Sequence, residues 1–497
     1  MGVILSGLEL NRRPVRAVIF DLDDTLIYTF KLKSFRENRD VHGLKANIGD
    51  SYVFGPVRKI ISHIKEEGIS LGLVTNSPRW YVDALLKHHE LDVFDAVVTY
   101  DDVGGSGIKP SPAGINLVIS KLEVVDLKSV IYIGDQDIDV EACYSAGVKP
   151  IVPSWATRRP VDQVPAVVLN SKSLISNFNN IDELSLIADR VALNKDISFP
   201  MSQMNFLPLD GEGKVVPLKK EDIKIISLGR YFSQSSSLTA KIHEDHALSK
   251  EIFKKETSKN YVFPEYYVDL FVKVVDGLPS YVFDSRDEFF DIVTVIPSKK
   301  DKNPRLENLL KRVCRKSKSK SSFIYDIFEF DRGSASLKTL GGKSSRSNEL
   351  RNNFHLKEKY KSGLYGKTIL VLDDIITTGA TFDAAFQLLK RANISLCMGV
   401  CLAKTVSVQE QHKICPRCHR IMRVRRNGKT NIHFYSCTGY YESDQCKYSE
   451  HIKIKTCPKC GKDMKKAFNY KEGRQFLTCT SYGTAEACGY TESVVER

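Results

Sequence analysis

Two identical cysteine patterns near the C-terminus constrain this chain of 497 residues more than any other feature of its sequence. Each reads Cys-x2-Cys-x18-Cys-x8-Cys, and the second follows the first at an offset of 42 residues. Four thiolates at such spacing are typical of a tetrahedral Zn²⁺ site. A unit of about 40 residues cannot bury a sufficient core alone, so metal must supply folding energy. We therefore expect two Zn²⁺ ions, held by Cys415, Cys418, Cys437 and Cys446 and by Cys457, Cys460, Cys479 and Cys488.

The two cysteine units, 413–451 and 455–494, also carry basic and aromatic residues, which neutralise phosphates and stack on bases in single-strand binding proteins. These are Arg423, Arg425, Arg426, Lys465 and Lys466, with Phe434, Tyr440, Phe476 and Tyr482. The short segments CPRC and CPKC, and CTGY and CTSY, resemble those of the C-terminal zinc ribbons of bacterial type IA DNA topoisomerases. This resemblance implies contact with single-stranded nucleic acid. The residues alone leave open a structural or protein-binding ribbon. The chain has no topoisomerase catalytic region, so that activity is not implied.

The first part of the chain, 14–180, alternates apolar strands with helical stretches, which predicts a doubly wound parallel α/β sheet. We expect strands at 15–20, 70–75, 96–100 and 130–133. Polar residues follow at the strand ends: Asp21 and Asp23 after the first strand, Thr75 at the end of the second, and Asp135 after the last. Open α/β sheets bind ligands at this edge, so these side chains predict a site.

Four segments of this domain resemble the motifs of the haloacid dehalogenase (HAD) hydrolase superfamily, in the family's order. They are Asp21-x-Asp23-x-Thr25, Thr75 in LVTNSP, Lys109 in IKPSP, and Asp135 with Asp139 in GDQDID. The resemblance implies a Mg²⁺-dependent phosphatase in which Asp21 is the nucleophile of an aspartyl-phosphate mechanism and Asp23 the general acid and base. Thr75 and Lys109 would hold the phosphoryl oxygens.

The same resemblance implies that Mg²⁺ lies among the carboxylates of Asp21, Asp23, Asp135 and Asp139, since this cation prefers oxygen ligands. Asp139 would steady either the metal shell or Lys109. Only 49 residues separate Thr25 from Thr75, which leaves little room for a cap domain. In this superfamily a small cap accompanies an open site, for large substrates or for pockets that a partner completes.

The next segment, 181–225, shows little periodicity and contains several Pro and Gly residues, which predicts a linker or irregular joint. Beyond it, 226–408 contains the sequence KTILVLDDIITTGAT at 367–381. An apolar strand there leads to Asp373 and Asp374, which suit the hydroxyls of a ribose. A small-residue loop then opens a helix, an arrangement that favours phosphate binding.

This segment resembles the phosphoribosyl pyrophosphate (PRPP) signature of type I phosphoribosyltransferases, most closely the ComF competence-factor type. The resemblance implies a second α/β domain that binds PRPP, with Mg²⁺, through the carboxylate pair, the signature loop and a pyrophosphate loop. Those residues are Asp373, Asp374, Thr377, Thr378, Gly379, Ala380 and Thr381, with Ser298, Lys299 and Lys300. The family's Arg-Gly-Phe-Asn-Gln element is replaced by 303–308, and some relatives only sense PRPP, so transfer remains open.

Charge is distributed unevenly over the chain, whose net charge is +13. Residues 1–190 hold 21 Lys and Arg against 25 Asp and Glu, whereas the last 84 residues hold 16 against 8. A basic second half favours polyanionic partners, either phosphorylated small molecules or nucleic acid. The sequence shows no long apolar span and no secretory signal, so we expect a cytoplasmic protein without a membrane partner.

Three functions fit these features. The first is an enzyme that combines a HAD phosphatase with a phosphoribosyltransferase on nucleotide or ribose-phosphate substrates, its ribbons contacting nucleic acid. The second is a nucleic-acid end-processing phosphatase with a regulatory PRPP-sensing domain. The third is a binding protein with little turnover. We favour the first for the catalytic parts, because a phosphatase would remove product from a reversible transfer.

Overall fold

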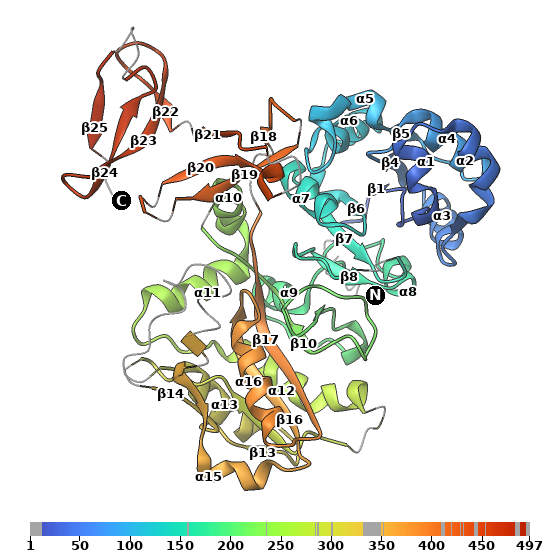
Figure 1. The fold of residues 1–497 in the computed structure, drawn as a ribbon. Coiled ribbons are helices and arrows are strands. Elements are labelled where there is room, and N and C mark those ends of the chain that lie inside the picture. Colours follow the sequence, from blue (N-terminus) through green and yellow to red (C-terminus); the bar gives the residue numbers. More distant parts are fainter. Residues whose placement is uncertain are drawn as a thin grey trace, which may run out of the picture. The chain divides into compact units, whose positions relative to one another are not determined.

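The computed structural model describes residues 12–493 except 157–158, 235, 284, 286–287, 300–301, 332–348, 351, 409–412, 419, 428, 431, 442–445, 453 and 483–487. The chain forms two compact units, Met1–Val408 and Gln409–Arg497 (Figure 1). Among the described residues, no helix combines the length and apolar character that a bilayer span requires.

The first sheet is parallel throughout, with the order β5-β4-β1-β6-β7-β8. Its central strand is the fully buried Ala-Val-Ile-Phe segment, as both faces of a parallel sheet are covered. This confirms the parallel α/β sheet predicted for the N-terminal part. The strands are β1 (Ala17–Phe20), β4 (Ser70–Val74), β5 (Ala96–Val98), β6 (Val130–Ile133), β7 (Lys149–Pro153) and β8 (Val167–Leu169).

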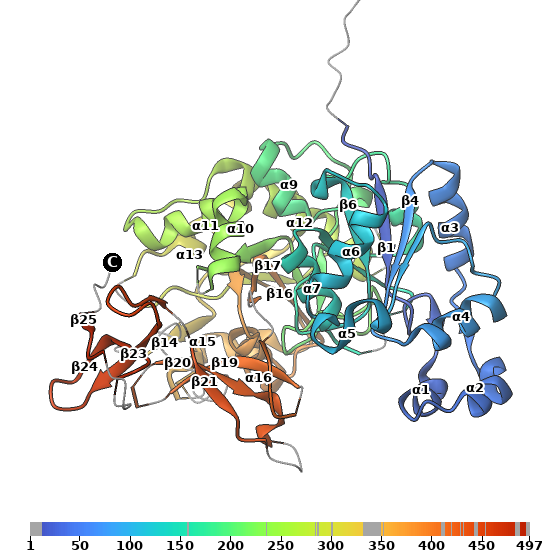
Figure 2. The same cartoon turned by 90° about the horizontal axis from the view of Figure 1, so that it is seen from above.

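The helices of this domain are amphipathic where they cover the sheet (Figure 2). In α3, for example, Val57, Ile60, Ile61 and Ile64 form one buried stripe. The helices are α3 (Val57–Glu66), α4 (Arg79–His88), α5 (Tyr100–Gly107), α6 (Ala113–Lys121), α7 (Asp137–Ala146) and α8 (Ser171–Ile175), with a 3-10 turn, η3 (Leu127–Ser129).

The insertion between β1 and β4 is small. It contains a two-stranded hairpin and short helical turns ahead of α3: β2 (Ile27–Tyr28), η1 (Phe30–Leu32), α1 (Lys33–Glu37), α2 (Val41–Asn47), η2 (Ile48–Asp50) and β3 (Tyr52–Val53). Asp40 caps α2 by accepting the backbone N–H of Gly43. Such an insertion is much smaller than a separate cap domain.

A second sheet follows with the order β13-β12-β16-β17-β10-β9, and β11 also pairs with β17. All its pairings are parallel except that of β9 with β10. Its strands are β9 (Leu207–Leu209), β10 (Ile225–Ser227), β11 (Arg230–Phe232), β12 (Ile292–Val295), β13 (Ser322–Phe323), β16 (Thr368–Ile376) and β17 (Leu396–Val406); β14 (Phe328–Phe330) and β15 (Phe354–Leu356) form a separate hairpin.

The helices around the second sheet include α12, whose buried residues recur on one side of the helix. They are α9 (Ile187–Asn194), α10 (Ser237–Asp245), α11 (Ala247–Thr257), α12 (Glu265–Val282), α13 (Arg305–Lys316), α15 (Glu358–Lys361) and α16 (Ala380–Arg391), with 3-10 turns η4 (Met201–Gln203) and η5 (Ser362–Leu364).

The structure differs from the expectation of an irregular joint at 181–225. This segment contains α9 and β9, and Leu186, Val191 and Leu207 are buried. Both elements are too short to show a clear period in the sequence. Pro208 stands at the edge of the sheet, where a strand tolerates proline. The segment is therefore part of the packed core.

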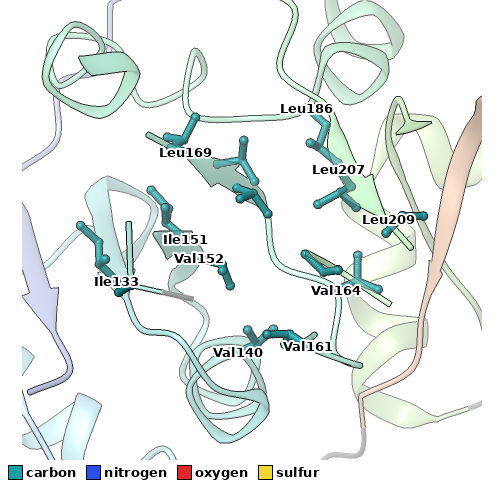
Figure 3. Packing of buried hydrophobic residues seen from close by; sticks show 14 of the residues in the cluster. Ile133, Val140, Ile151, Val152, Val161, Val164, Leu169, Leu186, Leu207 and Leu209 are labelled. Atoms are coloured by element: carbon teal, nitrogen blue, oxygen red, sulfur yellow. The ribbon is translucent and has the colours of Figure 1, made fainter. Parts of the chain in front are cut away.

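The two sheets of the first unit share one hydrophobic core (Figure 3). Val164, beyond β7, lies near Leu209 of β9, and Val161 lies beside Val140 of α7. The backbones of Val161 and Val215 also exchange two N–H···O bonds of 2.8 Å. The β7–β8 connection and the 210–222 segment are consequently held together.

A buried polar network also connects the first domain to the part of the chain that follows it. The Arg230 guanidinium donates to Asp189 of α9 at 2.8 Å and to the Tyr144 hydroxyl of α7 at 3.1 Å. Burial alone would raise the pKa of Asp189, but the charges of Arg230 and His246 outweigh it and lower the pKa to about 2. The ionised pair is thus the stable state of this network.

Replacing Asp189 by Ala is expected to destabilise the first unit by about 3–5 kcal/mol, because a buried guanidinium loses its partner. Since its folded pKa lies below the ordinary value, Asp189 contributes fully above pH ~4 and less as pH falls towards 2. Urea denaturation would measure the change. Asp182→Ala is the control, since its pair with Arg13 is exposed and should contribute under about 1 kcal/mol. Equal shifts in both variants would contradict the prediction.

The second unit contains two four-stranded antiparallel sheets with the same strand order. The first has β18 (Lys413–Ile414), β19 (Ile421–Arg426), β20 (His433–Cys437) and β21 (Ser449–His451), with a 3-10 turn η6 (Thr438–Tyr441). The second has β22 (Lys455–Thr456), β23 (Asp463–Asn469), β24 (Arg474–Cys479) and β25 (Thr491–Ser493). Each small core contains cysteines and one methionine, Met422 or Met464. The sequence repeat is thus a structural repeat.

Candidate functional site

Three carboxylates meet at the carboxyl edge of the first sheet. Asp21 follows β1, Asp135 follows β6, and Asp139 lies in the first turn of α7. One oxygen of each lies within 4.8 Å of the others. The Thr25 hydroxyl lies 3.0 Å from Asp135 Oδ1 and 3.4 Å from Asp21 Oδ2. The adjacent parallel strands β1 and β6 bring the first two together, as the sequence predicts from their positions.

Lys109 completes this cluster from the segment before α6. Its Nζ donates to Asp21 at 2.5 Å, to Asp139 at 2.7 Å and to the Tyr132 hydroxyl at 3.0 Å. Lys109 and Asp139 are both buried. Burial would lower the pKa of Lys109, but Asp139 and Asp21 outweigh it and raise that pKa. The lysine is therefore a buried cation held between Asp21 and Asp139.

The carboxylate cluster suits a divalent cation. Burial, followed by repulsion from Asp21 and Asp139, raises the pKa of Asp135 well above its ordinary value. Burial likewise raises the pKa of Asp21, although Lys109 opposes the effect. A cation with a preference for oxygen, such as Mg²⁺, would relieve this repulsion. Asp139 already accepts from Lys109 and from the backbone of Gln136, so it acts mainly as a support.

Asp23 lies apart from the three-carboxylate group. Its carboxylate accepts hydrogen bonds from the hydroxyls of Thr29 at 2.7 Å and Tyr81 at 3.0 Å, and it pairs with Arg36 at 2.9 Å. Arg36 belongs to α1 of the small insertion. The Asp23 side chain thus contacts the small insertion, whereas the sequence analysis also predicts Asp23 as a Mg²⁺ ligand. Its position beside the cluster suits proton transfer.

Thr75 is buried at the end of β4, beside Asp23. Its hydroxyl lies 3.5 Å from Asp23 Oδ2 and accepts the backbone N–H of Ser77 at 3.1 Å. The four predicted catalytic residues therefore lie around one edge of the sheet. Sequence reasoning missed the supports Arg36, Tyr81 and Tyr132. Their spacing carries no signal, because they reach the site from other elements.

A second carboxylate pair, Asp373 and Asp374, lies near the carboxyl end of β16 in the other sheet. Asp374 Oδ2 lies 2.7 Å from Arg305 Nε and 3.1 Å from Lys255 Nζ, and it pairs with both cations. Burial would raise the pKa of Asp374, but these two cations hold it well below its usual range. Burial and the neighbouring Asp374 instead raise the pKa of Asp373. The sequence did not indicate that Arg305 and Lys255 contact Asp374, because they belong to the separate helices α13 and α11.

The predicted phosphate loop connects β16 to α16. Gly379, with φ of +76°, is the N-cap of α16, a conformation that favours glycine. A Cβ there would meet the backbone of Glu212 at 2.7 Å. Thr377 O accepts from Lys404 Nζ at 2.5 Å, and burial lowers the pKa of Lys404 to about 8. Thr378, Ala380 and Thr381 belong to this same loop and first helical turn.

The predicted pyrophosphate loop follows β12, which pairs with β16, so it lies at the same sheet edge. The Ser298 backbone N–H donates to Glu307 of α13 at 2.8 Å. Lys299 lies over the Phe330 ring, 5.3 Å from its centroid, and Lys300 lies outside the described residues. A cavity of about 260 Å³ opens beside Arg305 and is also lined by Lys311, Arg312 and Arg315.

Each cysteine pattern closes into one group in the second unit. The four Sγ atoms of each group lie within 4.8 Å of one another, with Cys418–Cys437 at 3.3 Å and Cys460–Cys479 at 3.4 Å. These separations suit tetrahedral ligands around a small cation such as Zn²⁺. Tyr440 and Tyr482 are exposed, whereas Phe434 and Phe476 are half-buried. Lys465 and Lys466 are consecutive in β23, so their side chains lie on opposite faces of the strand.

Comparison with known proteins finds similarity in the first domain. A family model described as "Haloacid dehalogenase-like hydrolase" matches residues 38–152. This range contains Thr75, Lys109, Asp135 and Asp139. Asp21 precedes the range and directly follows β1, which pairs with two of its strands.

Several curated proteins are similar to part of the chain. A pyrophosphatase PpaX from Bacillus mycoides is 33% identical over 105 residues, which cover 20% of this chain and 46% of the relative. A phosphoglycolate phosphatase from Pseudomonas savastanoi is 28% identical over 144 residues, 28% of this chain and 51% of the relative. The chain spans about half the length of these relatives. A HAD-superfamily hydrolase structure from Ehrlichia chaffeensis has 21% identity and a TM-score of 0.26, over 35% of this chain and 98% of its own.

Proposed function

On the premise of a haloacid dehalogenase-like hydrolase domain in the N-terminal part, we propose that this chain is a Mg²⁺-dependent phosphatase. The observation that carries the proposal is the group of Asp21, Asp135 and Asp139 with the Lys109 ammonium 2.5 Å from Asp21. A nucleophilic carboxylate, a fixed cation and a cation-binding acid pair are what phosphoryl transfer through a carboxylate requires.

The proposed reaction has two steps. The Asp21 carboxylate attacks phosphorus, and the bond to the ester oxygen breaks while Asp23 supplies a proton to the leaving alcohol. Asp23 then takes a proton from water, which attacks phosphorus and releases phosphate from Asp21. Lys109 neutralises charge on the phosphoryl oxygens, and Thr75 donates a hydrogen bond to them. Bound Mg²⁺, held by Asp21 and Asp135, would supply further charge neutralisation.

We further propose that the second sheet binds PRPP and transfers its ribose 5-phosphate to an acceptor. The buried Asp373–Asp374 pair supports this function, because Asp374 pairs with Arg305, a residue that lines the basic cavity, and the Gly379 loop follows the same strand. The carboxylates suit the ribose hydroxyls, the loop suits the 5-phosphate, and the basic cavity suits pyrophosphate. A phosphatase in the same chain would then remove the phosphate of a related product.

Replacing Asp374 by Asn is expected to lower PRPP affinity by roughly a hundredfold, because the amide cannot accept both ribose hydroxyls and Arg305 as an ionised carboxylate does. Calorimetry with PRPP and Mg²⁺ measures the affinity, and pyrophosphate release with an acceptor panel measures transfer. Asp383→Asn, an exposed change on α16, is the matched control. Unchanged PRPP affinity would contradict the proposed site, and affinity without pyrophosphate release would favour a sensor.

The two cysteine units are proposed to bind Zn²⁺ and to contact single-stranded nucleic acid. Exposed Tyr440 and Tyr482, together with the basic strands, support this role. The alternative function is end processing, in which these units deliver a strand to the phosphatase site and PRPP binding is regulatory. Phosphate release from ribose 5-phosphate and from a 3′-phosphorylated oligonucleotide distinguishes the two. The alternative predicts that deletion of 409–497 raises KM for the oligonucleotide only.

A further inference from the structure

We propose that the cleft between the loop after β7 and the 210–222 segment is the specificity pocket of the phosphatase site, and that it takes the non-transferred end of a sugar or nucleoside phosphate carrying a second phosphate group. The inference rests on the proposed phosphatase function. The insertion after β1 is too small to form a cap domain that selects the substrate. The inference assigns that selection to another part of the chain.

The cleft begins at the carboxyl edge of the first sheet, because its lining residues Ser154 and Trp155 directly follow β7. Trp155, two residues beyond β7, donates its indole N–H to the Thr25 carbonyl at 3.2 Å. The Thr25 hydroxyl in turn contacts Asp135 and Asp21. One wall of the cleft therefore contacts Thr25, the residue whose hydroxyl contacts the proposed nucleophile. On this contact the inference places the non-transferred end of the substrate in the cleft.

The size and lining of the cleft suit a small phosphorylated molecule. Its volume of about 640 Å³ lies within the range of ligand pockets. The lining combines Trp155, whose ring can cover a sugar or base, with the cations Arg159 and Lys219 and the acids Asp210 and Asp222. Within the described parts of the chain, neither Arg159 nor Lys219 has an ion-pair partner. Arg159 and Lys219 can therefore each contact an anionic group, whereas Asp210 Oδ1 is engaged by the backbone N–H groups of Glu212 and Lys214.

The wall formed by the 210–222 segment is fixed to the first domain. Leu218 N donates to the Ser154 hydroxyl at 2.9 Å, and Val161 and Val215 exchange two backbone hydrogen bonds. Asp210 Oδ1 accepts the backbone N–H groups of Glu212 and Lys214, which holds the turn at the edge of the cleft. The pocket is therefore a permanent part of the first unit. It is built from a segment outside the hydrolase domain.

Direct binding tests the pocket without requiring turnover. In the Asp21→Asn background with Mg²⁺, calorimetry compares adenosine 3′,5′-bisphosphate with adenosine 5′-monophosphate. We expect Lys219→Ala and Arg159→Ala each to raise the Kd of the bisphosphate about tenfold and that of the monophosphate about twofold or less, because only the bisphosphate places a charge there. Lys224→Ala, an exposed lysine outside the lining, should leave both affinities unchanged.

The outcomes separate this inference from the phosphatase function. Equal Kd values for the two nucleotides, no measurable binding, or binding insensitive to Lys219 and Arg159 would each overturn the pocket. Phosphate release that depends on Asp21 would still support the phosphatase. Binding that depends on Lys219, without phosphate release from either nucleotide or from other esters, would show that the cleft binds the bisphosphate, but it would overturn the phosphatase and with it the role of the cleft in substrate selection.

Discussion

Asp21→Asn is expected to lower phosphate release from any substrate ester by roughly a thousandfold or more, because an amide cannot attack phosphorus as a carboxylate does. Phosphate release with Mg²⁺ from ribose 5-phosphate, nucleotides and para-nitrophenyl phosphate measures the effect. Burial disfavours the ionised Asp21 carboxylate, so the neutral amide should not lower the melting temperature of the first unit. A loss of activity would then reflect chemistry and not unfolding.

The same motif offers a matched control. Asp24 lies three residues after the nucleophile, accepts the backbone N–H of Thr29 at 3.0 Å and is not part of the three-carboxylate group. Its φ is +56°, which asparagine tolerates well. Asp24→Asn should retain activity within about threefold. Comparable losses in the two variants, or residual activity near wild type in Asp21→Asn, would exclude Asp21 as the nucleophile.

Cys460→Ser is expected to reduce bound Zn²⁺ from two ions to one per chain and to unfold its cysteine unit. Structural Zn²⁺ contributes on the order of 10–16 kcal/mol to the folding of such small units, far more than their few buried side chains supply. Metal analysis of the purified protein measures the stoichiometry. Limited proteolysis of 455–494 measures the loss of structure.

A cysteine of similar exposure provides the control for this experiment. Cys314 is exposed on α13, outside both four-cysteine groups, so Cys314→Ser should retain two ions. Cys418→Ser in the other unit should also reduce the content to one, because the units repeat at an offset of 42 residues. Two ions retained by Cys460→Ser would exclude the four-thiolate site.

The first domain shows why some residues could be predicted. The Ala-Val-Ile-Phe strand is apolar because a central parallel strand is covered on both faces, and Asp21 follows it directly. Neighbouring parallel strands place their ends together, so the meeting of Asp21 with Asp135 follows from the order of elements. Arg36, Lys255 and Arg305 could not be found this way. Each reaches its acid from a separate helix, and nothing in local sequence indicates that approach.

The prediction of an irregular joint at 181–225 was wrong for a different reason. Its helix and strand are short, and Pro200 and Pro208 suggest an irregular chain. Pairing with β10 and contact with β8 stabilise β9, and packing against α11 and α12 stabilises α9. These contacts are visible only in the folded unit. The cleft beside Trp155 depends on the same packing. Local propensity cannot predict either, because the stabilising contacts join residues about 60 positions apart.

By itself the sequence determined the parallel α/β sheet of the first domain, the acids at its edge and the duplicated cysteine spacing. These properties depend on local periodicity and on fixed spacing, which a chain carries before it folds. The tertiary structure alone decided that Asp23 faces Arg36, that Asp374 is neutralised by two cations, and that the 210–222 segment walls a cleft beside Thr25. Those are contacts between distant residues, and only packing of the shared core brings them within bonding distance.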